Sequence, residues 1–316
     1  MLAIGENTGV EEAIANAQHA MGSTHMWRGN LVPARDHFER AAAIYNRDLE
    51  RYLPMPNAGV IPGRCQLGWT LWALGYPEKA RARVREALSL ARKLNRPYSM
   101  AFALQFAIAA EALCGDYAQI RAQSEALIEL SQQHGYPHWL ASGKMSLGAS
   151  VVVEEDFDRG IALMREGMAG TREYGTLPVY RYGLVLMAET LSHAGNVEEG
   201  LRALDEAAEG IQADERFNEA EIWRLRGEFM LAKRQEQAAA ENFRHAIEVA
   251  RAQQGKSWEL RATFSLAKML FSQDHPAEAH ATIAPVYQWF SEGFDTRDLV
   301  LAKDLLDRLQ QEKPQR

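Results

Sequence analysis

One tripeptide has the residue types that hold a phosphate group. Gly255-Lys256-Ser257 resembles the end of a phosphate-binding loop, in which backbone amides and a lysine bind a nucleotide. That loop also requires a glycine five residues before its second glycine, and a preceding strand. Position 250 is Ala250, and the residues before it have a helical pattern. We therefore interpret the tripeptide as a connection between helices.

Two histidines and two cysteines have side chains that could bind metal or act as nucleophiles. His134 and His138 are spaced like zinc ligands on one helix, but a glycine and a proline between them would break that helix. Cys65 and Cys114 are single, without a Cys-x-x-Cys partner. We interpret the histidines as ordinary turn residues and the cysteines as small buried residues.

Clustered carboxylates suggest acid/base or metal chemistry but have a simpler role. Glu154-Glu155-Asp156, Glu198-Glu199 and Asp214-Glu215 lie where predicted helices begin or predicted repeats join. Acidic residues there complement the positive end of the helix dipole. The sequence shows no cyclase, Walker A or other catalytic constellation, so we expect a non-catalytic protein without cofactor or metal.

The elements that position all these residues recur at a fixed period. Small or compact residues recur at intervals of 40, 40, 40, 39 and 40, each followed twelve residues later by a second such residue. The first positions are Gly68, Ile108, Gly148, Ala188, Gly227 and Ala267. Two antiparallel helices approach closely only where no bulky side chain separates them. The period therefore predicts stacked helical hairpins, like tetratricopeptide (TPR) repeats on longer helices.

Apolar residues recur at three and four throughout, which predicts an all-α chain without strands. Glycine and proline mark the turns. We expect one α-solenoid domain over residues 1–316, with residues 1–10 disordered and an irregular loop over 46–63 that is either a connector or a binding element. The predicted pairs are 11–28 with 31–46, 63–75 with 77–94, 97–114 with 116–134, 137–153 with 156–174, 178–194 with 197–212, 216–233 with 235–254, and 256–272 with 275–292, followed by a closing helix at 296–310.

Composition narrows the partners and the compartment. The chain has 316 residues, 47% of them hydrophobic, with a net charge of −7 and two cysteines. The acidic balance argues against nucleic acid, and we find no secretory signal and no apolar run long enough to cross a bilayer. We expect a cytoplasmic protein. Basic residues on the helix over 77–94 fit a solvated face, with an anionic partner as the alternative.

The concave wall of such a solenoid is lined mainly by the first helix of each pair. Spacing from the small positions places aromatic residues early on this wall and charged residues late, and both kinds commonly anchor partners. Core packing is the alternative for each aromatic residue. The candidate partner-binding residues are Trp69, Trp72, Phe102, Gln105, Tyr182, Glu189, Glu221, Arg224, Glu228, Arg261 and Lys268.

Several long strings extend the interpretation beyond the repeat. They are Leu71–Pro77, Ala101–Leu104, Glu219–Glu228, Gln253–Ala262, Ala284–Thr296 and Asp298–Leu299. These strings resemble the C-terminal TPR-like region of bacterial class III adenylate/guanylate cyclase–ATPase–TPR proteins, over about residues 15–310. The resemblance implies a regulatory role beside an ATPase or cyclase module. The loop over 46–63 departs from the family pattern.

Three classes of function follow. The first is a scaffold that binds a protein or peptide segment in signal transduction. The second is a sensor whose concave groove holds a small ligand or signalling peptide, which would need a deep apolar cavity if the ligand is small. The third is an enzyme, for which Glu189, Glu221 and Glu228 are the only acid/base candidates on the wall.

Overall fold

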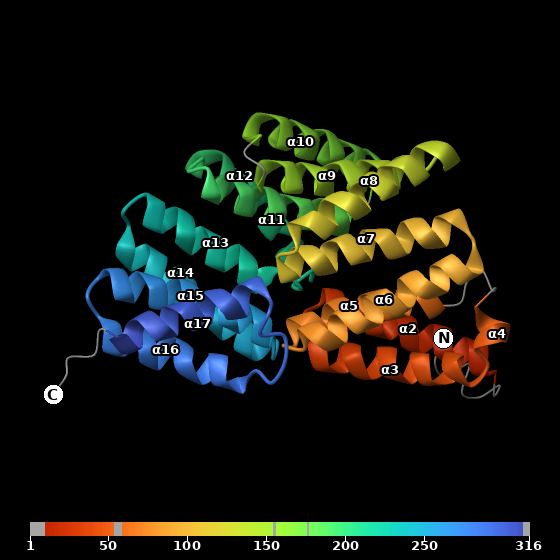
Figure 1. Ribbon diagram of the computed structural model, residues 1–316, viewed down its shortest axis with the longest axis horizontal. Coiled ribbons are helices and arrows are strands. Elements are labelled where there is room, and N and C mark those ends of the chain that lie inside the picture. Colours follow the sequence, from red (N-terminus) through yellow and green to blue (C-terminus); the bar gives the residue numbers. More distant parts are fainter. Residues whose placement is uncertain (1–9, 54–58, 154–155, 176, 312–316) are drawn as a thin grey trace. The chain divides into compact units, whose positions relative to one another are not determined.

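The computed structural model describes residues 10–53, 59–153, 156–175 and 177–311, and over these ranges the chain forms helices and turns without a strand (Figure 1). The helices are α2 (Glu11–Trp27), α3 (Leu31–Arg47), α4 (Leu49–Tyr52), α5 (Val60–Ala73), α6 (Pro77–Leu94), α7 (Pro97–Cys114), α8 (Tyr117–His134), α9 (Pro137–Val153), α10 (Phe157–Glu173), α11 (Leu177–His193), α12 (Val197–Gln212), α13 (Glu219–Ala232), α14 (Glu236–Ala252), α15 (Lys256–Ser272), α16 (Pro276–Trp289) and α17 (Arg297–Gln311).

The chain divides into two compact units. Unit 1 comprises Met1–Trp72 and Glu78–Tyr180, and unit 2 comprises Ala73–Pro77 and Arg181–Arg316. Within each unit consecutive helices pack as antiparallel pairs, such as α9 with α10 and α13 with α14, and each pair packs on the next. The single domain over 1–316 stays a prediction.

The helix ends follow the turn residues. Gly115 and Gly135 end α7 and α8 in the left-handed conformation, with φ of 82° and 68°, which a side chain would disfavour. The Asp116 carboxylate caps α8 and the Asp156 carboxylate caps α10, accepting hydrogen bonds from the backbone N–H groups of Gln119 and Arg159 at 3.2 and 3.3 Å. These caps explain why the predicted and observed bounds agree closely.

The recurring small residues are the points of closest approach between paired helices. A Cβ atom on Gly148 of α9 would lie 2.5 Å from the Gly160 carbonyl oxygen of α10 and 2.7 Å from Met164. A Cβ on Gly68 would lie 2.7 Å from Val84, and one on Gly227 would lie 2.4 Å from Phe243. The predicted close approach of two small residues is confirmed for Gly148 with Gly160 and for Gly68, whose added Cβ would also lie 3.1 Å from the Ala80 carbonyl oxygen, whereas at Gly227 the nearest side chain is that of Phe243.

The structure corrects two predictions, the irregular loop over 46–63 and the absence of a membrane-length apolar run, and does not test the predicted disorder at 1–10. The region 46–63, predicted as an irregular loop, includes the end of α3, the one-turn helix α4 and the start of α5 from Val60, while 54–58 lies outside the described residues. The predicted disorder at 1–10 falls almost wholly on residues 1–9, also outside that description. Against the prediction of no membrane-length run, α7 is long and apolar enough to cross a bilayer, but 61% of it is buried, as in a core helix.

Together these features make the chain an all-helical solenoid of TPR-like hairpins. The core lies between the helices, where alanine and larger apolar side chains alternate. In unit 2, for example, Ala239, Phe243 and Ala246 of α14 are fully buried against α15 and α13. The face of each first helix that does not pack in the core is available to line the predicted concave wall of the solenoid.

Candidate functional site

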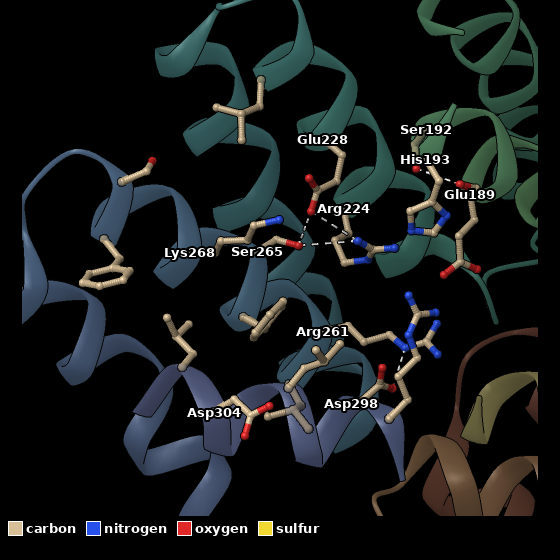
Figure 2. A pocket seen from close by; sticks show the side chains of 18 of the residues that line it. Glu189, Ser192, His193, Arg224, Glu228, Arg261, Ser265, Lys268, Asp298 and Asp304 are labelled. Carbon is tan, nitrogen blue, oxygen red and sulfur yellow. Dashed lines mark hydrogen bonds and ion pairs between the residues drawn. The ribbon is translucent and has the colours of Figure 1, made fainter. Parts of the chain in front are cut away.

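The walls of α11, α13, α15 and α17 enclose a groove in unit 2 (Figure 2). Its volume is about 1320 Å³. α11, α13 and α15 are the first helices of successive pairs, and α17 takes the equivalent place after the last pair. We call this cavity the unit 2 groove. Its polar and charged lining residues are Glu189, Ser192, His193, Arg224, Glu228, Arg261, Ser265, Lys268, Ser272, Arg297, Asp298, Asp304, Asp307 and Arg308.

An ionic network joins α13 to α15 along the floor of the groove. Glu221, Arg224 and Glu228 are three and four residues apart, so they share one face of α13. The Arg224 guanidinium donates two hydrogen bonds to the Glu221 carboxylate, at 2.7 and 2.9 Å. Its other nitrogen lies 3.4 Å from both Glu228 and the Ser265 hydroxyl, which itself donates to Glu228 at 2.6 Å.

The same network continues to α17. Arg261 of α15 donates to Glu221 at 3.3 Å and to Asp298 at 2.7 Å. Its guanidinium also lies 5.6 Å from the centre of the Trp258 ring. The Glu221 carboxylate therefore holds two arginines from two helices, and Asp298 fixes the second arginine from a third helix.

Burial sets the electrostatics of this floor. Glu221 is only 3% exposed. Burial on its own would raise the pKa of the Glu221 carboxyl, but Arg224 and Arg261 outweigh it and hold the pKa below its ordinary value. The neighbouring carboxylates likewise outweigh burial and raise the pKa of both arginines. The network stays ionised at neutral pH, with the three carboxylates of Glu221, Glu228 and Asp298 paired with the guanidinium groups of Arg224 and Arg261.

Glu189 and Lys268, two other charged residues of the groove, form no such pair. In the described part of the chain, the Glu189 carboxylate accepts no hydrogen bond, and the Lys268 ammonium has no ion-pair partner. Lys268 is exposed and Glu189 half-buried. Figure 2 shows Glu189 and His193 at one side of the groove and Lys268 and Asp304 at the other. Burial lowers the pKa of His193, with Glu189 acting against it, so the imidazole is largely neutral at pH 7.

Apolar side chains complete the lining. Phe264 and Phe271 of α15 and Leu301 and Leu305 of α17 border the groove. Leu301 is 39% exposed, a high value for leucine. The Arg308 guanidinium lies 5.0 Å from the centre of the Phe271 ring, so its charge sits over an aromatic face. The groove can therefore hold an apolar side chain beside fixed charges of both signs.

Comparison with solved structures places this geometry among known helical-repeat proteins. A Rap protein complexed with Competence and Sporulation Factor superposes with a TM-score of 0.63 and 12% identity, over 95% of this chain and 76% of that one. NprR in complex with its cognate peptide NprX superposes with a TM-score of 0.62 and 12% identity, over 94% of this chain and 85% of NprR. The Rap conjugation gene regulator of plasmid pLS20 in complex with the Phr* peptide superposes with a TM-score of 0.64 and 12% identity, over 98% of this chain and 78% of the regulator.

These likenesses show the fold. At 12% identity they extend no further. No family model and no curated protein sequence matches the chain. The TPR-like solenoid is thus established by the helices themselves and by these structural neighbours, while the predicted cyclase–ATPase–TPR membership stays a proposal.

The charged half of the predicted wall lies in the unit 2 groove. Glu189, Arg224, Glu228, Arg261 and Lys268 all line it. The two other candidates on these helices are buried: Glu221 lies in the ionic network under the floor, and Tyr182 of α11 is 9% exposed. A direct contact of either side chain with a partner is not supported by this burial.

In the early part of the predicted wall, Trp69, Trp72 and Gln105 lie in the core. Trp69 and Trp72 of α5 are 5% and 2% exposed, and Gln105 of α7 is 4% exposed. The Trp69 indole donates to the Phe106 carbonyl oxygen at 3.2 Å, and Phe102 stacks on Phe106 with ring centres 4.8 Å apart. Phe102 alone of these four is partly exposed. The alternative of core packing fits Trp69 and Trp72 better than an exposed docking surface.

Sequence reasoning missed six charged or titratable residues of the groove. They are His193, Arg297, Asp298, Asp304, Asp307 and Arg308. Five of them belong to α17, which was predicted only as a closing helix. The period that located the wall residues on the first helices, continued by one more repeat, would have pointed to the closing helix as part of the wall.

The patterns that first suggested chemistry have structural roles. Gly255 precedes α15 and follows α14 rather than a strand, and Lys256 pairs with Glu259 at 2.6 Å. His134 ends α8 and His138 lies in α9, so they are not on one helix. Burial raises the pKa of the Cys65 thiol well above its ordinary range, which makes it unreactive. Within the described ranges, no group of three or more His, Cys, Asp or Glu is arranged to hold a metal ion.

Proposed function

We propose that this protein is a non-catalytic TPR-like regulatory module that binds a peptide, or a peptide segment of a protein partner, in the unit 2 groove. The observation that carries the proposal is the lining of this groove. It combines a prearranged ionic floor on α13, α15 and α17 with an apolar border and with the side chains of Glu189 and Lys268, which form no hydrogen bond or ion pair with another side chain of the described residues. Such a surface can recognise a main chain, its side chains and its charges together.

The groove fits a peptide better than a small apolar ligand. Pockets for small ligands usually measure about 300–1,000 Å³ and are lined mainly by apolar side chains. This groove is larger, at about 1320 Å³, and fourteen of its twenty-two lining residues are polar or charged. A peptide carries a hydrogen-bonding group at every residue, so it can satisfy such a lining along its length.

The structural neighbours support the same class of ligand. Two of them were solved with a named peptide, NprX or Phr*, and the third with Competence and Sporulation Factor. A signalling peptide is therefore a reasonable form of the ligand, which joins the scaffold and the sensor hypotheses in one site. The resemblance of the sequence to the TPR-like tail of bacterial cyclase–ATPase proteins supports a regulatory output, with an ATPase or nucleotide cyclase module as the protein that responds in the cytoplasm.

Two neighbouring residues of α17 provide a matched test. Leu301 and Val300 are 39% and 41% exposed, but only Leu301 lines the groove. Leu301→Glu and Val300→Glu each place one carboxylate on the surface of the same helix. We expect Leu301→Glu to reduce binding about tenfold or more, because a charge displaces an apolar contact from the site.

The measurement is affinity selection from a pool of random twelve-residue peptides, followed by mass spectrometry and titration of the selected peptides. Wild type and Val300→Glu should enrich the same peptides with equal affinity, and Leu301→Glu should lose them. Helix content by circular dichroism should match in all three proteins. Absence of enrichment by the wild-type protein, or equal binding by Leu301→Glu, would contradict the proposed function.

A further inference from the structure

The charges of the unit 2 groove are unevenly distributed along its length. Around Glu189 the carboxylates outnumber the guanidinium groups by one. The carboxylates there are Glu189, Glu221, Glu228 and Asp298, and the guanidinium groups are Arg224, Arg261 and Arg297. We call this part the acidic end. Glu221, Glu228 and Asp298 all accept hydrogen bonds within the network, whereas the Glu189 carboxylate accepts none among the described residues, so Glu189 is the carboxylate of this end that is open to a ligand.

The opposite end has the opposite excess. Lys268 lies three residues before Phe271 on α15, and Arg308 of α17 stacks over Phe271, so the two cations are near one another. Asp304 and Asp307 also line this part of the groove, and Asp307 is paired with Lys303, so two cations stand against one remaining carboxylate. We call this part the basic end. Lys268 is its exposed and unpaired cation.

The helices set the distance between the two ends. Arg261 and Asp298 lie near the acidic end, while Lys268 and Arg308 form the basic end. Seven residues separate Arg261 from Lys268 on α15, which is about 10 Å of helix, and ten separate Asp298 from Arg308 on α17, which is about 15 Å. An extended peptide covers about 3.3–3.6 Å per residue, so this span corresponds to roughly four residues.

We infer that the unit 2 groove binds a short linear peptide of about four residues by both of its free ends, with the α-ammonium group at Glu189 and the α-carboxylate at Lys268 and Arg308. This inference rests on the proposed function and specifies the ligand of the same site. Each terminus would compensate the excess charge that the groove leaves at that end. Ser265 lies between Arg261 and Lys268 on α15, where its hydroxyl can meet the main chain, and Phe264, Leu301 and Leu305 border the space for side chains.

The test uses a pool of random tetrapeptides made without Asp, Glu, Lys, Arg, His or Cys. The pool is prepared in four forms: uncapped, N-acetylated, C-amidated and capped at both ends. Affinity selection on the wild-type protein should favour the uncapped form, and each cap should weaken binding about tenfold or more, as expected for the loss of a charge-assisted hydrogen bond.

Two variants connect each cap to one side chain. Glu189→Gln should remove the penalty of N-acetylation and leave the penalty of C-amidation. Lys268→Met should do the converse. Glu248→Gln and Lys233→Met are the matched controls: both residues are exposed, both lie outside the groove, and both variants should keep both penalties.

Each contrary outcome has a defined meaning. Equal binding of capped and uncapped tetrapeptides would overturn the inference and leave the proposed function intact. A second contrary outcome uses a peptide that is capped at both ends and has Lys first and Glu last. If it binds as tightly as the uncapped tetrapeptides, the inference is overturned, because charged side chains of an internal segment would then suffice and free chain ends would not be required. If no tetrapeptide binds in any form while twelve-residue peptides do, the assignment of free ends is wrong. Failure of both pools would overturn the proposed function as well.

Discussion

Glu221 occupies the centre of the ionic network, where one carboxylate accepts hydrogen bonds from Arg224 and Arg261. Water has little access to these three groups, because Glu221 is 3% exposed and the two arginine side chains are 12% exposed. It therefore cannot readily take the place of a lost partner. Paired charges of this kind hold helices in register, and charges without partners remain available to a ligand. This difference separates Glu221 from Glu189, although both were predicted as partner-binding residues.

Replacing Glu221 by glutamine should destabilise the folded protein. The amide keeps the shape but removes the charge that compensates two buried guanidinium groups, and breaking a buried ion pair from one side typically costs about 3–5 kcal/mol. We expect a loss of roughly 3 kcal/mol in the free energy of unfolding, measured by urea denaturation at pH 7. Glu248→Gln, at an exposed and weakly paired position, should change this free energy little.

The pH dependence of this loss has a definite sign. Arg224 and Arg261 hold the pKa of Glu221 below its ordinary value of 4.5 despite burial. The carboxylate therefore contributes stability that is fully present above pH 4.5 and is lost as the pH falls through the lowered pKa. The difference in stability between the wild-type protein and Glu221→Gln should be constant from pH 7 to 5 and shrink below pH 4.5. A difference that grows on acidification would contradict the ionised network.

At the scale of the element, close helix pairing depends on single glycines. The methyl group of an alanine at position 148 would lie 2.5 Å from a carbonyl oxygen and 2.7 Å from the backbone nitrogen of Met164. Backbone atoms of α10 cannot rotate away as a side chain can. The pair α9–α10 must therefore separate to admit even one methyl group.

Gly148→Ala should lower the free energy of unfolding by about 1–3 kcal/mol, as overpacking of a close contact does. Gly63→Ala is the matched control, because it lies within helix α5 and its added Cβ would have an ordinary contact of 3.4 Å with His19. Alanine is favoured over glycine inside a helix by roughly 0.5–1 kcal/mol, so the control should be neutral or stabilising. Urea denaturation of the three proteins measures both effects. An unchanged midpoint for Gly148→Ala would show that α9 and α10 are not in close contact there.

The helices could be predicted closely because their signals are local. Small residues at a period of 40 locate each pair, and turn residues such as Gly115 and Gly135 locate each end. The region around α4 was harder to predict. Its turn residues indicate only where a helix cannot continue, and do not predict a short helix. In the structure, Tyr52 of α4 is 1% exposed, and its ring packs edge-on to that of Tyr45 with 5.5 Å between the ring centres. Such tertiary contacts are not visible in local sequence.

The site was predictable in position but not in pairing. Helical spacing placed Glu189, Arg224 and Lys268 on one wall, and all three line the unit 2 groove. Which charges cancel depends on contacts such as Arg261 with Asp298, 37 residues apart on separate helices. The aromatic residues show the same limit, because a tryptophan such as Trp72 has the same spacing whether it faces the groove or the core.

At the scale of the whole molecule, a solenoid distributes its stability among nearest neighbours. Each helix pair of unit 2 packs on the next, from α13 and α14 to α15 and α16 and then to α17. Each of the helices α13 and α15 packs most extensively on the second helix of its own pair. A ligand that contacts α11, α13, α15 and α17 together would add contacts that link these helices to one another. Its effect on local opening should therefore be concentrated in the helices that line the groove.

Hydrogen exchange measured by mass spectrometry tests this expectation with a selected peptide. At a free concentration one hundred times its Kd, a ligand that binds only the folded state stabilises it by about 2.7 kcal/mol. Amides that exchange by opening of α13, α15 and α17 should slow by up to about a hundredfold, since each 1.4 kcal/mol is a factor of ten. Amides of α2, α3 and α5 in unit 1 should be unchanged, because no lining residue of the groove belongs to them. Protection confined to α5 and α7 would instead place the ligand beside Trp69 and Phe102 and make the aromatic half of the predicted wall the binding surface.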